Sequence, residues 1–417
     1  MNAAGGNRRI LFVDADTGRT GSTVSLEYLL HGFRSSGYEV FVLTPKSDPA
    51  VVSLLAKDAV VIGAGGWKMN SLGLSLHFSN TLSWFSWRGI VVMAKDIVKM
   101  FVVLRIVLRT IRETGAALVY ANEYVLLQAY VAASLLRIPA VVHVRSPLLR
   151  GTFGLRRAIV SRVILLCNRA VIAITRLEAE QFRPGGRDRG KISVIGEFVR
   201  VAEAERLSPA GCREEFGLPP GKKVVAMLGG IQRVKGTIDF LHAADRVARQ
   251  YRDVHFVIAG MAARGETGYY DACMKIAEGL KAEGSLTIMG EITDPLHLIA
   301  ASDIIVSPSP ESHFSRPVIE AWAASKPVIA ARTEHMRELI ADGVNGLLVD
   351  PGDDAALAGC IRRLLESPET GGNLGREGKR KAEDEFDGER NVQTIVGICD
   401  GVIPREASGS SQCAGGR

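Results

Sequence analysis

Short apolar runs alternate with longer amphipathic segments along most of this 417-residue chain. In the first half the runs lie at the following ranges: 8–16, 38–45, 117–123, 139–145 and 170–175. Between most of them, apolar residues recur at helical spacing, as in the segment 24–36 that Gly37 ends. Strands that alternate with helices pair in parallel and are covered on both faces. The first half therefore predicts a parallel sheet with helices on both sides.

The alternation stops after residue 199 and restarts at residue 223. The segment 200–222 is polar and contains three prolines, and we interpret it as a linker with one short helix. A second α/β domain is predicted from strand-like runs at 223–230, 254–260, 286–290, 303–309, 327–331 and 346–350. The predicted fold class is therefore α/β, with two Rossmann-like domains at 1–200 and 223–385. An amphipathic segment lies within 386–404, and residues 405–417 are expected to be disordered.

The charge, the cysteine spacing and the apolar segments indicate the ligands and the cellular compartment of this protein. The formal net charge is +6 and the pI is near 9.0, which is compatible with anionic ligands or membrane surfaces. The six cysteines are scattered without a Cys-x-x-Cys pair, as in proteins of a reducing compartment. The first ten residues lack an apolar signal segment, and charges interrupt the apolar stretch 89–111. We expect a cytoplasmic protein with no membrane span and no nucleic-acid partner.

One segment after a predicted strand carries the residue types of a phosphate site. Ligands of open parallel sheets bind at the carboxyl ends of the strands. The strand 223–228 ends in Gly229 and Gly230, which allow a ligand to approach the backbone closely. Lys235 follows at the expected start of a helix, where a cation indicates a bound anion, and Arg233 could add donors. A pair of solvated charges is the alternative.

The segment 307–330, SPSPESHFSRPVIEAWAASKPVIA, places glutamates on both sides of a helix start. Ser315 is in position to cap a helix that contains Pro317 in its first turn. Three backbone amides there are expected to be free for a phosphate or a sugar hydroxyl: those of Phe314, Ser315 and Arg316. A carboxylate can accept hydrogen bonds from ribose hydroxyls, so we predict ribose at Glu320 and a sugar near Glu311. A capped helix with surface glutamates is the alternative.

These segments resemble one known family. The runs KVVAMLGGIQRVKG and ASDIIVSPSPESHFSRPVIEAWAASKPVIA, with the runs 288–294, 336–353 and 357–366, look like the C-terminal half of retaining glycosyltransferases of family 4. The N-terminal run 18–45 resembles the glycine-rich loop and first helix of that family. The resemblance implies a GT-B fold, in which two Rossmann-like domains face a central cleft. It also implies that a nucleotide-sugar binds the C-terminal domain, an acceptor binds the N-terminal domain, and the C-terminal helix crosses back to the N-terminal domain.

The chain departs from the family pattern in two places. The family separates its two glutamates by seven residues, whereas eight lie between Glu311 and Glu320, so Ser312 occupies the expected position. The family carries Gly-Arg before its lysine, and here Gly230 stands in the arginine position. We expect either that the loop shifts to bring Glu311 to the sugar or that Ser312 makes this contact. Arg233 is the candidate for the missing positive charge.

The resemblance implies roles for particular residues of this chain. The catalytic set comprises Lys235, Arg233 and Glu311. The donor-binding set comprises Gly21, Ser22, Gly230, Lys235, Ser312, His313, Phe314, Ser315, Arg316 and Glu320. The acceptor side comprises Asn122, Glu123 and His143, each of which could instead be an ordinary packed or capping residue.

The resemblance also implies a mechanism without a protein nucleophile. The acceptor hydroxyl attacks from the front face, and the leaving diphosphate assists its deprotonation. The protein then positions the substrates and stabilises the diphosphate. We expect no cofactor and no obligatory metal, since a cationic site can replace a metal.

The segment 77–112 suggests a membrane surface as a further partner. Trp84 and Trp87 precede an apolar helix studded with basic residues, a mixture found in interfacial helices. Four cations are expected to strengthen binding to anionic lipid: Lys95, Lys99, Arg105 and Arg109. Such binding would place the protein on the inner face of the cell membrane beside a lipid-linked acceptor. A core helix with a polar stripe is the alternative.

The predicted function is transfer of a sugar from a nucleotide-diphosphate sugar to a hydroxyl of a glycan or glycolipid, as in cell-surface polysaccharide synthesis. A nucleotide-sugar 2-epimerase shares the two-domain form and is one alternative. A catalytically silent GT-B scaffold protein is the other, and the two departures from the family pattern leave it open, whereas the glutamate loop and the Lys-Gly helix start favour the transferase.

Overall fold

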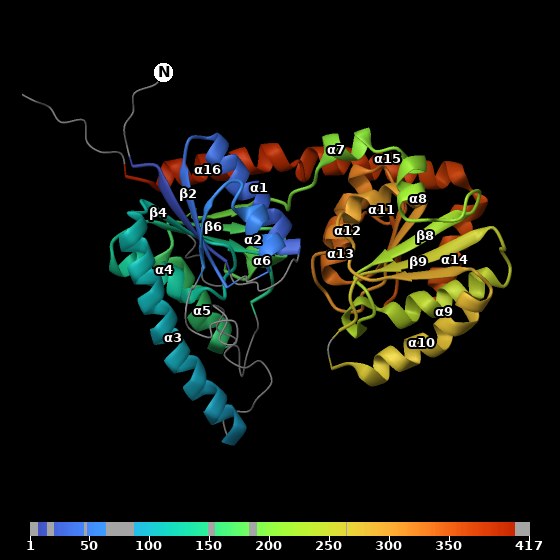
Figure 1. Cartoon of the computed structure of the whole chain (residues 1–417), viewed down its shortest axis with the longest axis horizontal. Helices are drawn as coiled ribbons and strands as arrows, with labels where there is room; N and C mark the ends of the chain where they lie inside the picture. The colour runs from blue at the N-terminus through green and yellow to red at the C-terminus, as the bar shows by residue number, and fades with distance from the viewer. Residues whose placement is uncertain are drawn as a thin grey trace, which may run out of the picture. The chain divides into compact units, whose positions relative to one another are not determined.

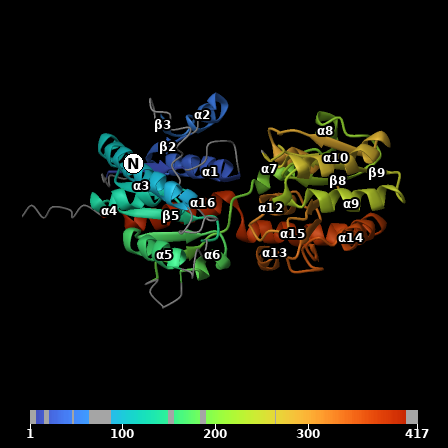
Figure 2. The same cartoon turned by 90° about the horizontal axis from the view of Figure 1, so that it is seen from below.

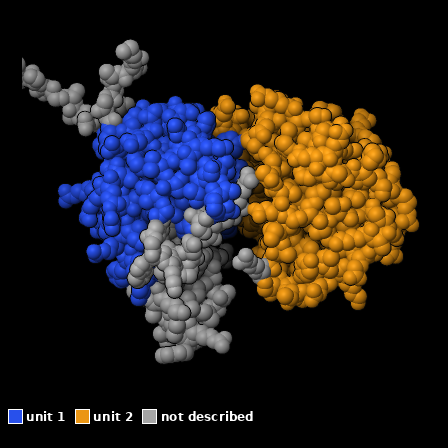
Figure 3. All heavy atoms as spheres, viewed as in Figure 1, with its two compact units in different colours: residues 1–195, 392–417 blue, residues 196–391 orange. Residues whose placement is uncertain are grey.

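The computed structural model describes residues 7–14, 21–45, 48–63, 87–148, 155–182, 190–263 and 265–404. The chain divides into two compact units (Figure 3). Unit 1 comprises residues 1–195 and 392–417, and unit 2 comprises residues 196–391. The segment 201–222, expected to be a linker with one helix, belongs to unit 2 and forms two short helices, α7 (Val201–Arg206) and α8 (Pro209–Glu215).

Unit 1 contains a sheet of seven parallel strands in the order β3-β2-β1-β4-β5-β6-β7 (Figure 1). The strands are β1 (Arg9–Val13), β2 (Glu39–Thr44), β3 (Val60–Gly63), β4 (Leu118–Ala121), β5 (Ala140–Val144), β6 (Ala170–Ala173) and β7 (Ile192–Val194). The register pairs Ile10 of β1 with Val40 on one side and Leu118 on the other. The central strands are buried along their whole length, as their nearly continuous apolar sequence requires.

Helices pack on both faces of this sheet. They are α1 (Gly21–Ser35), α2 (Pro49–Leu55), α3 (Trp87–Thr114), α4 (Leu127–Leu135), α5 (Leu155–Cys167), α6 (Arg176–Glu180) and α16 (Gly388–Val402), whose first four residues belong to unit 2. Residues of α3, α4 and α5 form one core with alternate residues of the strands. On the sheet itself, the side chains of Phe12 and Tyr120 stack together with Phe33 of α1. Gly32 lets α1 and α16 approach closely, because a Cβ there would lie 2.1 Å from the Val392 side chain.

Unit 2 contains a sheet of six parallel strands in the order β10-β9-β8-β11-β12-β13. The strands are β8 (Lys223–Leu228), β9 (Val254–Ala259), β10 (Leu286–Met289), β11 (Ile304–Ser307), β12 (Val328–Ala331) and β13 (Leu347–Val349). The further helices of this unit are α9 (Thr237–Ala248), α10 (Thr267–Ala282), α11 (Pro295–Ala301), α12 (Arg316–Ala323), α13 (Glu334–Leu339), α14 (Asp354–Glu366) and α15 (Pro368–Glu385). A 3₁₀ turn, Arg233–Lys235, precedes α9.

The sheet of unit 2 separates two cores. Helices α9, α10 and α14 supply one core and α8, α11 and α12 supply the other, while α15 contributes Leu374 to the first and Ala382 to the second. Figure 1 and Figure 2 show where these helices lie in unit 2. The largest fully buried side chain is that of Trp322, whose indole Nε1 donates a hydrogen bond to the Asn345 carbonyl at 2.8 Å. Helix α15 passes it at Gly378, where a Cβ would lie 2.1 Å from the indole ring.

A repeated local signal starts several helices. In α2, α8, α11 and α15 an N-cap Asp or Ser accepts a hydrogen bond from a first-turn amide, and the next residue is proline. Proline is favoured at this position because its missing N–H would have no helical partner. The starts of these helices are therefore encoded locally, whether the helix follows a strand, as α2 and α11 do, or another helix, as α8 and α15 do.

Candidate functional site

The turn after β8 is built around glycines that no larger residue could replace. Gly229 and Gly230 have φ angles of +131° and +72°, in the region that favours glycine. A Cβ on Gly230 would lie 2.1 Å from the Met261 carbonyl oxygen, which follows β9. Gly236 has a φ of +70°, and a Cβ there would lie 2.2 Å from the Pro308 carbonyl oxygen, which follows β11. These contacts bring the ends of three neighbouring strands together.

Lys235 lies in this cluster of strand ends. It precedes the left-handed Gly236 and so belongs to the 3₁₀ turn, whereas the sequence predicted that it would open the helix. Its stem packs against Gly229, and its Nζ lies 3.0 Å from Nε2 of His313. Burial lowers the pKa of the Lys235 ammonium, and the charge of Glu311 opposes this shift. The cation is thus partly removed from water, where a bound anion would gain more from it.

The hydrogen bonds around His313 define its role. Its Nδ1 lies 3.0 Å from the Glu311 carbonyl oxygen, which can only accept, so Nδ1 carries the proton. Its Nε2 then accepts a hydrogen bond from the Lys235 ammonium. Burial and the adjacent Lys235 lower the pKa of His313 to about 4. His313 is therefore neutral at pH 7 and holds Lys235 in place without repelling it.

The loop before α12 contains one residue more than the family pattern. Its two candidates for the sugar contact, Glu311 and Ser312, have different partners. Glu311 is exposed, and its charge acts on Lys235. Ser312 instead contacts His335 of α13, with 2.7 Å between its Oγ and Nδ1 and a further hydrogen bond from the His335 amide. Of these two side chains, the structure associates Glu311 with the lysine.

Glu320 belongs to an ion network in the interior of unit 2. Arg316 contacts Glu320 Oε1 at 3.1 Å and Glu197 Oε2 at 3.2 Å, and it also donates to the Phe198 carbonyl. The three charged side chains are only 14%, 15% and 5% exposed, respectively. Buried ion pairs of this kind depend on every partner, since removal of one leaves an uncompensated charge. Arg316 therefore fixes the orientation of Glu320.

The helix that carries Glu320 begins where the sequence predicted, but its cap differs. Ser315 is the N-cap residue of α12, yet its side chain makes no capping hydrogen bond. Its hydroxyl lies 2.9 Å from that of Ser307 at the end of β11, which ties the loop to the strand. Phe314 packs against the core through Phe386, with ring centroids 6.1 Å apart. The predicted capping role of the Ser315 side chain is therefore wrong.

Arg233 does not share the partners of Lys235. Its guanidinium lies over the ring of Tyr269, 4.7 Å from the centroid, and its amide donates to Glu266 at 2.9 Å. A cation–π contact of this kind holds the charge at the α10 side of the turn. A direct role of Arg233 at the diphosphate remains a prediction.

A second group of polar side chains is buried at the strand ends of unit 1. Asn122 follows β4 and donates from Nδ2 to Asp14, which follows β1, at 3.0 Å. His143 lies inside β5, where its Nδ1 is 2.8 Å from the Tyr120 hydroxyl and 3.2 Å from the Arg145 guanidinium. Burial strongly lowers the pKa of His143, so this side chain is neutral. Three of the strands thus bring polar groups to one edge of the sheet.

Glu123 completes that group. Its Oε1 accepts hydrogen bonds from the Tyr124 and Arg145 amides, at 2.8 and 3.4 Å. Burial raises the pKa of the Glu123 carboxyl to about 8, although these hydrogen bonds and the Arg145 charge oppose the shift. The carboxyl is therefore largely protonated at pH 7 and can donate a hydrogen bond.

Two predicted residues of the glycine-rich loop lie in a helix. Gly21 and Ser22 open α1, whereas the sequence placed them in the loop that follows β1. Residues 15–20 lie outside the described residues. The Gly21 carbonyl accepts a hydrogen bond from the Ser25 hydroxyl at 3.2 Å. A side chain of α1 itself therefore contacts the first backbone carbonyl of this helix.

The helix predicted within 77–112 is present as α3, but its charged residues differ from the expected arrangement. Helix α3 exposes Val98 and Phe101, at 63% and 61%, together with Arg105. Lys99, expected to face lipid, is buried instead, and Arg109 pairs with Glu113 at 2.6 Å. Trp84 and the side chains of Trp87 and Lys95 lie outside the described residues. No helix within the described ranges combines the length and apolar character that crossing a bilayer requires.

Several residues of these groups were not singled out from the sequence. They are Asp14, Tyr120, Arg145, Glu197, Tyr269 and His335. Asp14 and Arg145 lie at the carboxyl ends of predicted strand-like runs and directly follow the observed strands β1 and β5, and this position could have identified them. Glu197 and His335 carried no such signal, because their partners Arg316 and Ser312 are distant in the sequence.

Two family models match the chain and together cover most of it. The model described as glycosyl transferases group 1 matches residues 212–381, within unit 2. The model described as glycosyl transferase 4-like domain matches residues 20–196, within the N-terminal part. The boundary between the two matches falls close to the division between the units.

Curated relatives are similar over part of their length. A putative glycosyltransferase, EpsD of Bacillus subtilis, is 31% identical over 217 residues, which are 52% of this chain and 55% of the relative. The D-inositol 3-phosphate glycosyltransferase of Corynebacterium efficiens is 28% identical over 264 residues, which are 59% of this chain and 62% of the relative. The matched region thus spans little more than half the length of these relatives.

Solved structures match over nearly the whole chain. The structure of HepE from Anabaena in complex with UDP-glucose superposes with a TM-score of 0.75 and 22% identity, over 94% of this chain and 100% of that one. A glycosyltransferase from Rickettsia africae gives a TM-score of 0.76 at 17% identity, over 96% and 100% of the chains. At such identities the likeness concerns the fold, which has two parallel α/β sheets of seven and six strands here. With the two family models, it establishes that this chain belongs to the GT-B glycosyltransferases of group 1, family 4.

Proposed function

We propose that this protein transfers a hexosyl residue from a nucleotide-diphosphate sugar to a hydroxyl of a glycan or lipid-linked acceptor, with retention at the anomeric carbon. Family membership supports glycosyl transfer, and the HepE structures contain UDP and UDP-glucose. A role in cell-surface polysaccharide or glycoconjugate synthesis is part of the same proposal.

The observation that carries the proposal is the placement of Lys235. A half-buried ammonium is held by a neutral histidine at the joined ends of three strands. Its burial disfavours the charged form, and a diphosphate bound beside it would restore the charge balance. A fixed donor in a partly dry site stabilises the charge that develops on the departing diphosphate. Transfer then needs no protein nucleophile, only this cation and correct positioning.

Ribose binding is assigned to Glu320 and is compatible with its ion pair. An ionised carboxylate offers about four acceptor positions on two oxygens. Arg316 contacts Oε1 of Glu320, and a carboxylate held in this way can still accept hydrogen bonds from vicinal hydroxyls. On the acceptor side, we assign hydroxyl contacts to the strand-end group of Asn122, Glu123 and His143. The protonated Glu123 carboxyl can donate to an acceptor oxygen. Nδ1 of His143 accepts from the Arg145 guanidinium, so this neutral imidazole carries its proton on Nε2.

A lipid-linked acceptor is the preferred kind. The exposed face of α3 presents Val98 and Phe101 beside Arg105, which suits the surface of an anionic membrane. The burial of Lys99 and the pairing of Arg109 leave fewer cations for this contact than the sequence predicted. We propose peripheral binding through this face on the inner side of the cell membrane.

The test begins with the nucleotide. UDP, GDP and ADP are compared by thermal unfolding, since a ligand of the folded state raises the melting temperature. The nucleotide that binds is then supplied as a panel of sugar donors, and released sugar is measured. A transferase slowly releases free sugar, an epimerase converts the donor into a different sugar nucleotide, and a silent scaffold protein leaves the donor unchanged.

Lys235→Ala is the decisive variant in this assay. We expect a loss of about 2–4 kcal/mol of transition-state stabilisation, the effect of removing one preorganised donor. Lys223→Ala is the matched control, because Lys223 is also in unit 2 but pairs with Asp303 at the start of β8. Full activity and unchanged nucleotide affinity in Lys235→Ala would refute the assignment of the diphosphate.

A further inference from the structure

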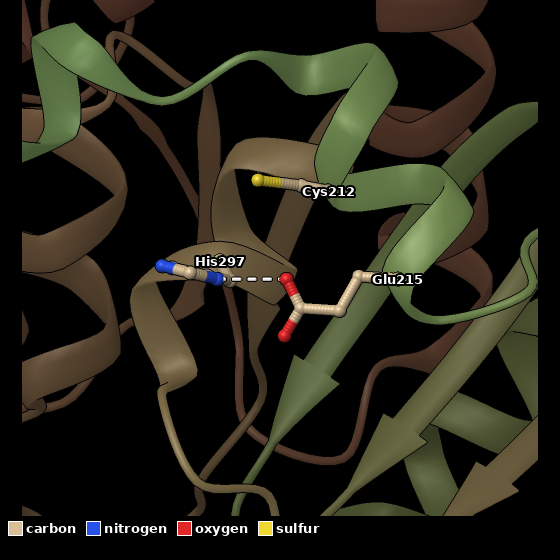
Figure 4. A group of neighbouring side chains, drawn as sticks. All are labelled: Cys212, Glu215 and His297. Atoms are coloured by element: carbon tan, nitrogen blue, oxygen red, sulfur yellow. Dashed lines mark hydrogen bonds and ion pairs between the residues drawn. The ribbon is translucent and has the colours of Figure 1, made fainter.

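Three side chains with metal-binding atoms converge between α8 and α11, on a part of unit 2 that the proposed donor site does not use (Figure 4). Cys212 and Glu215 lie on α8, and His297 lies in the first turn of α11. One ligand atom from each of the three lies within 4.8 Å of the others. The closest pair is Nδ1 of His297 and Oε2 of Glu215, 2.8 Å apart.

The neighbouring charges distinguish this cluster from a second one that shares His297. Glu203 and Asp294 also approach His297. Both carboxylates, however, are neutralised by Arg200, which contacts Glu203 at 2.8 Å and Asp294 at 2.7 Å. A cation placed among them would have to displace the guanidinium.

Within the part of the chain that the structure describes, no arginine or lysine forms an ion pair with Glu215 of the first cluster, whose ion-pair partner is His297. The Cys212 thiol is buried and forms no disulfide. Burial and the charge of Glu215 raise the pKa of this thiol, while the charge of Lys326 opposes the shift. A divalent cation bound beside the thiol would itself favour the thiolate, the form that binds metals. The side chains of Glu215 and His297 are 51% and 30% exposed, so an ion can reach them from solvent.

We propose that Cys212, Glu215 and His297 form a binding site for a divalent transition-metal ion of the zinc class. A thiolate, an imidazole and a carboxylate are the ligands that zinc takes in proteins, and three protein ligands leave the fourth position to water. The thiolate excludes magnesium and calcium, which prefer oxygen ligands only. The site is independent of the proposed sugar transfer.

The ligand atoms must move at two points. A Zn–S bond of about 2.3 Å places sulfur about 3.6 Å from the nitrogen and oxygen ligands of a tetrahedral ion. The Cys212 Sγ lies within 4.8 Å of those atoms, so it would approach them by at most about 1.2 Å. Tetrahedral zinc with bonds of about 2.0–2.1 Å to nitrogen and oxygen places those two atoms about 3.3 Å apart. The Glu215 carboxylate would therefore move about 0.5 Å away from His297, starting from 2.8 Å. Because Glu215 is half exposed, a rotation of its side chain achieves this. The bound ion would fasten α8 to α11 within unit 2.

Equilibrium dialysis of the untagged, reduced full chain against zinc chloride measures the stoichiometry and affinity. We expect one zinc ion per chain, unaffected by excess magnesium. Cobalt(II) serves as a spectroscopic probe, because a cobalt–thiolate bond gives a charge-transfer band that carboxylate and imidazole ligands do not give. Zinc should also raise the melting temperature of the wild type.

Single substitutions assign the ligands. Glu215→Gln and His297→Asn alter exposed side chains and are expected to fold, and Cys212→Ser removes the thiolate. Each should weaken zinc binding by more than about tenfold, since even the loss of a group that merely supports a ligand costs 10–100-fold. Cys360→Ser is the matched control, a cysteine in α14 that should leave the binding unchanged. Nucleotide binding should be the same in all four variants, which separates this site from the donor site.

Three results would overturn the proposal. The first is a wild type that binds no zinc at this stoichiometry. The second is a cobalt complex without a thiolate band, or one whose band persists in Cys212→Ser. The third is zinc binding that survives Cys212→Ser and Glu215→Gln but is lost in Glu203→Gln, which would move the ion to the carboxylates around Arg200.

Discussion

The substitution His313→Asn tests the arrangement at the centre of the proposed donor site. In the wild type, burial and the Lys235 ammonium lower the pKa of His313 to about 4. A histidine in an unfolded chain has a pKa of about 6.5. Between these two values the unfolded state binds more protons than the folded state. The free energy of unfolding must therefore fall as the pH falls from 6.5 to 4.

The size of this effect follows from the two pKa values. Integration from pH 7 to pH 5 gives a loss of about 2 kcal/mol from His313 alone. The contact between the Lys235 ammonium and His313 can account for this loss of unfolding free energy. Two unit charges 3.0 Å apart repel by about 5.5 kcal/mol at an effective dielectric constant of about 20. Asparagine does not titrate, so the variant should lack this part of the pH dependence.

Urea unfolding at pH 7 and pH 5 measures the difference. His242→Asn is the matched control, because His242 is an exposed histidine of α9 in the same unit. The wild type and this control should lose about 2 kcal/mol more than His313→Asn between the two pH values. Equal losses in all three proteins would refute the neutral, buried His313 and its hydrogen bond from Lys235.

Three further predictions concern the ribose, the strand-end turn and the membrane. Glu320→Ala should abolish the preference for a ribose donor over its 2′-deoxyribose analogue in calorimetry; a preference that persists would place the ribose elsewhere. Gly217→Ala, in open space at φ +60°, should cost about 1 kcal/mol of left-handed strain. Gly230→Ala should cost clearly more, because its Cβ would lie 2.1 Å from a carbonyl oxygen, and equal shifts in thermal unfolding would contradict this. Replacing Phe101 and Arg105 with serine and glutamine should weaken sedimentation with anionic liposomes at low salt, and a wild type that fails to bind them would exclude this membrane contact.

The sequence alone determined the architecture and the location of the candidate donor site. Apolar runs with helical segments between them require parallel strands, and both sheets are parallel throughout. Glycines, prolines and capping residues act within a few residues of their own position, so strand ends and helix starts could be predicted from neighbours in the chain. This is why Gly229, Gly230 and Lys235 were identified after a strand, and Glu320 in the helix that follows the next loop. The family resemblance rested on the same local patterns.

Only the tertiary structure decided which of these side chains meet. Lys235 is held by His313, Ser312 is turned to His335, and Arg316 joins Glu320 to Glu197. The burial of Lys99, in a helix expected to present it to lipid, was likewise decided by packing.

The physical reason is that a contact between distant residues depends on how helices and strands pack, whereas sequence periodicity reports only which face of one element is apolar. Cys212 and His297 illustrate this limit. No spacing in the sequence relates them, and they meet because α8 and α11 pack on the same face of the sheet in unit 2.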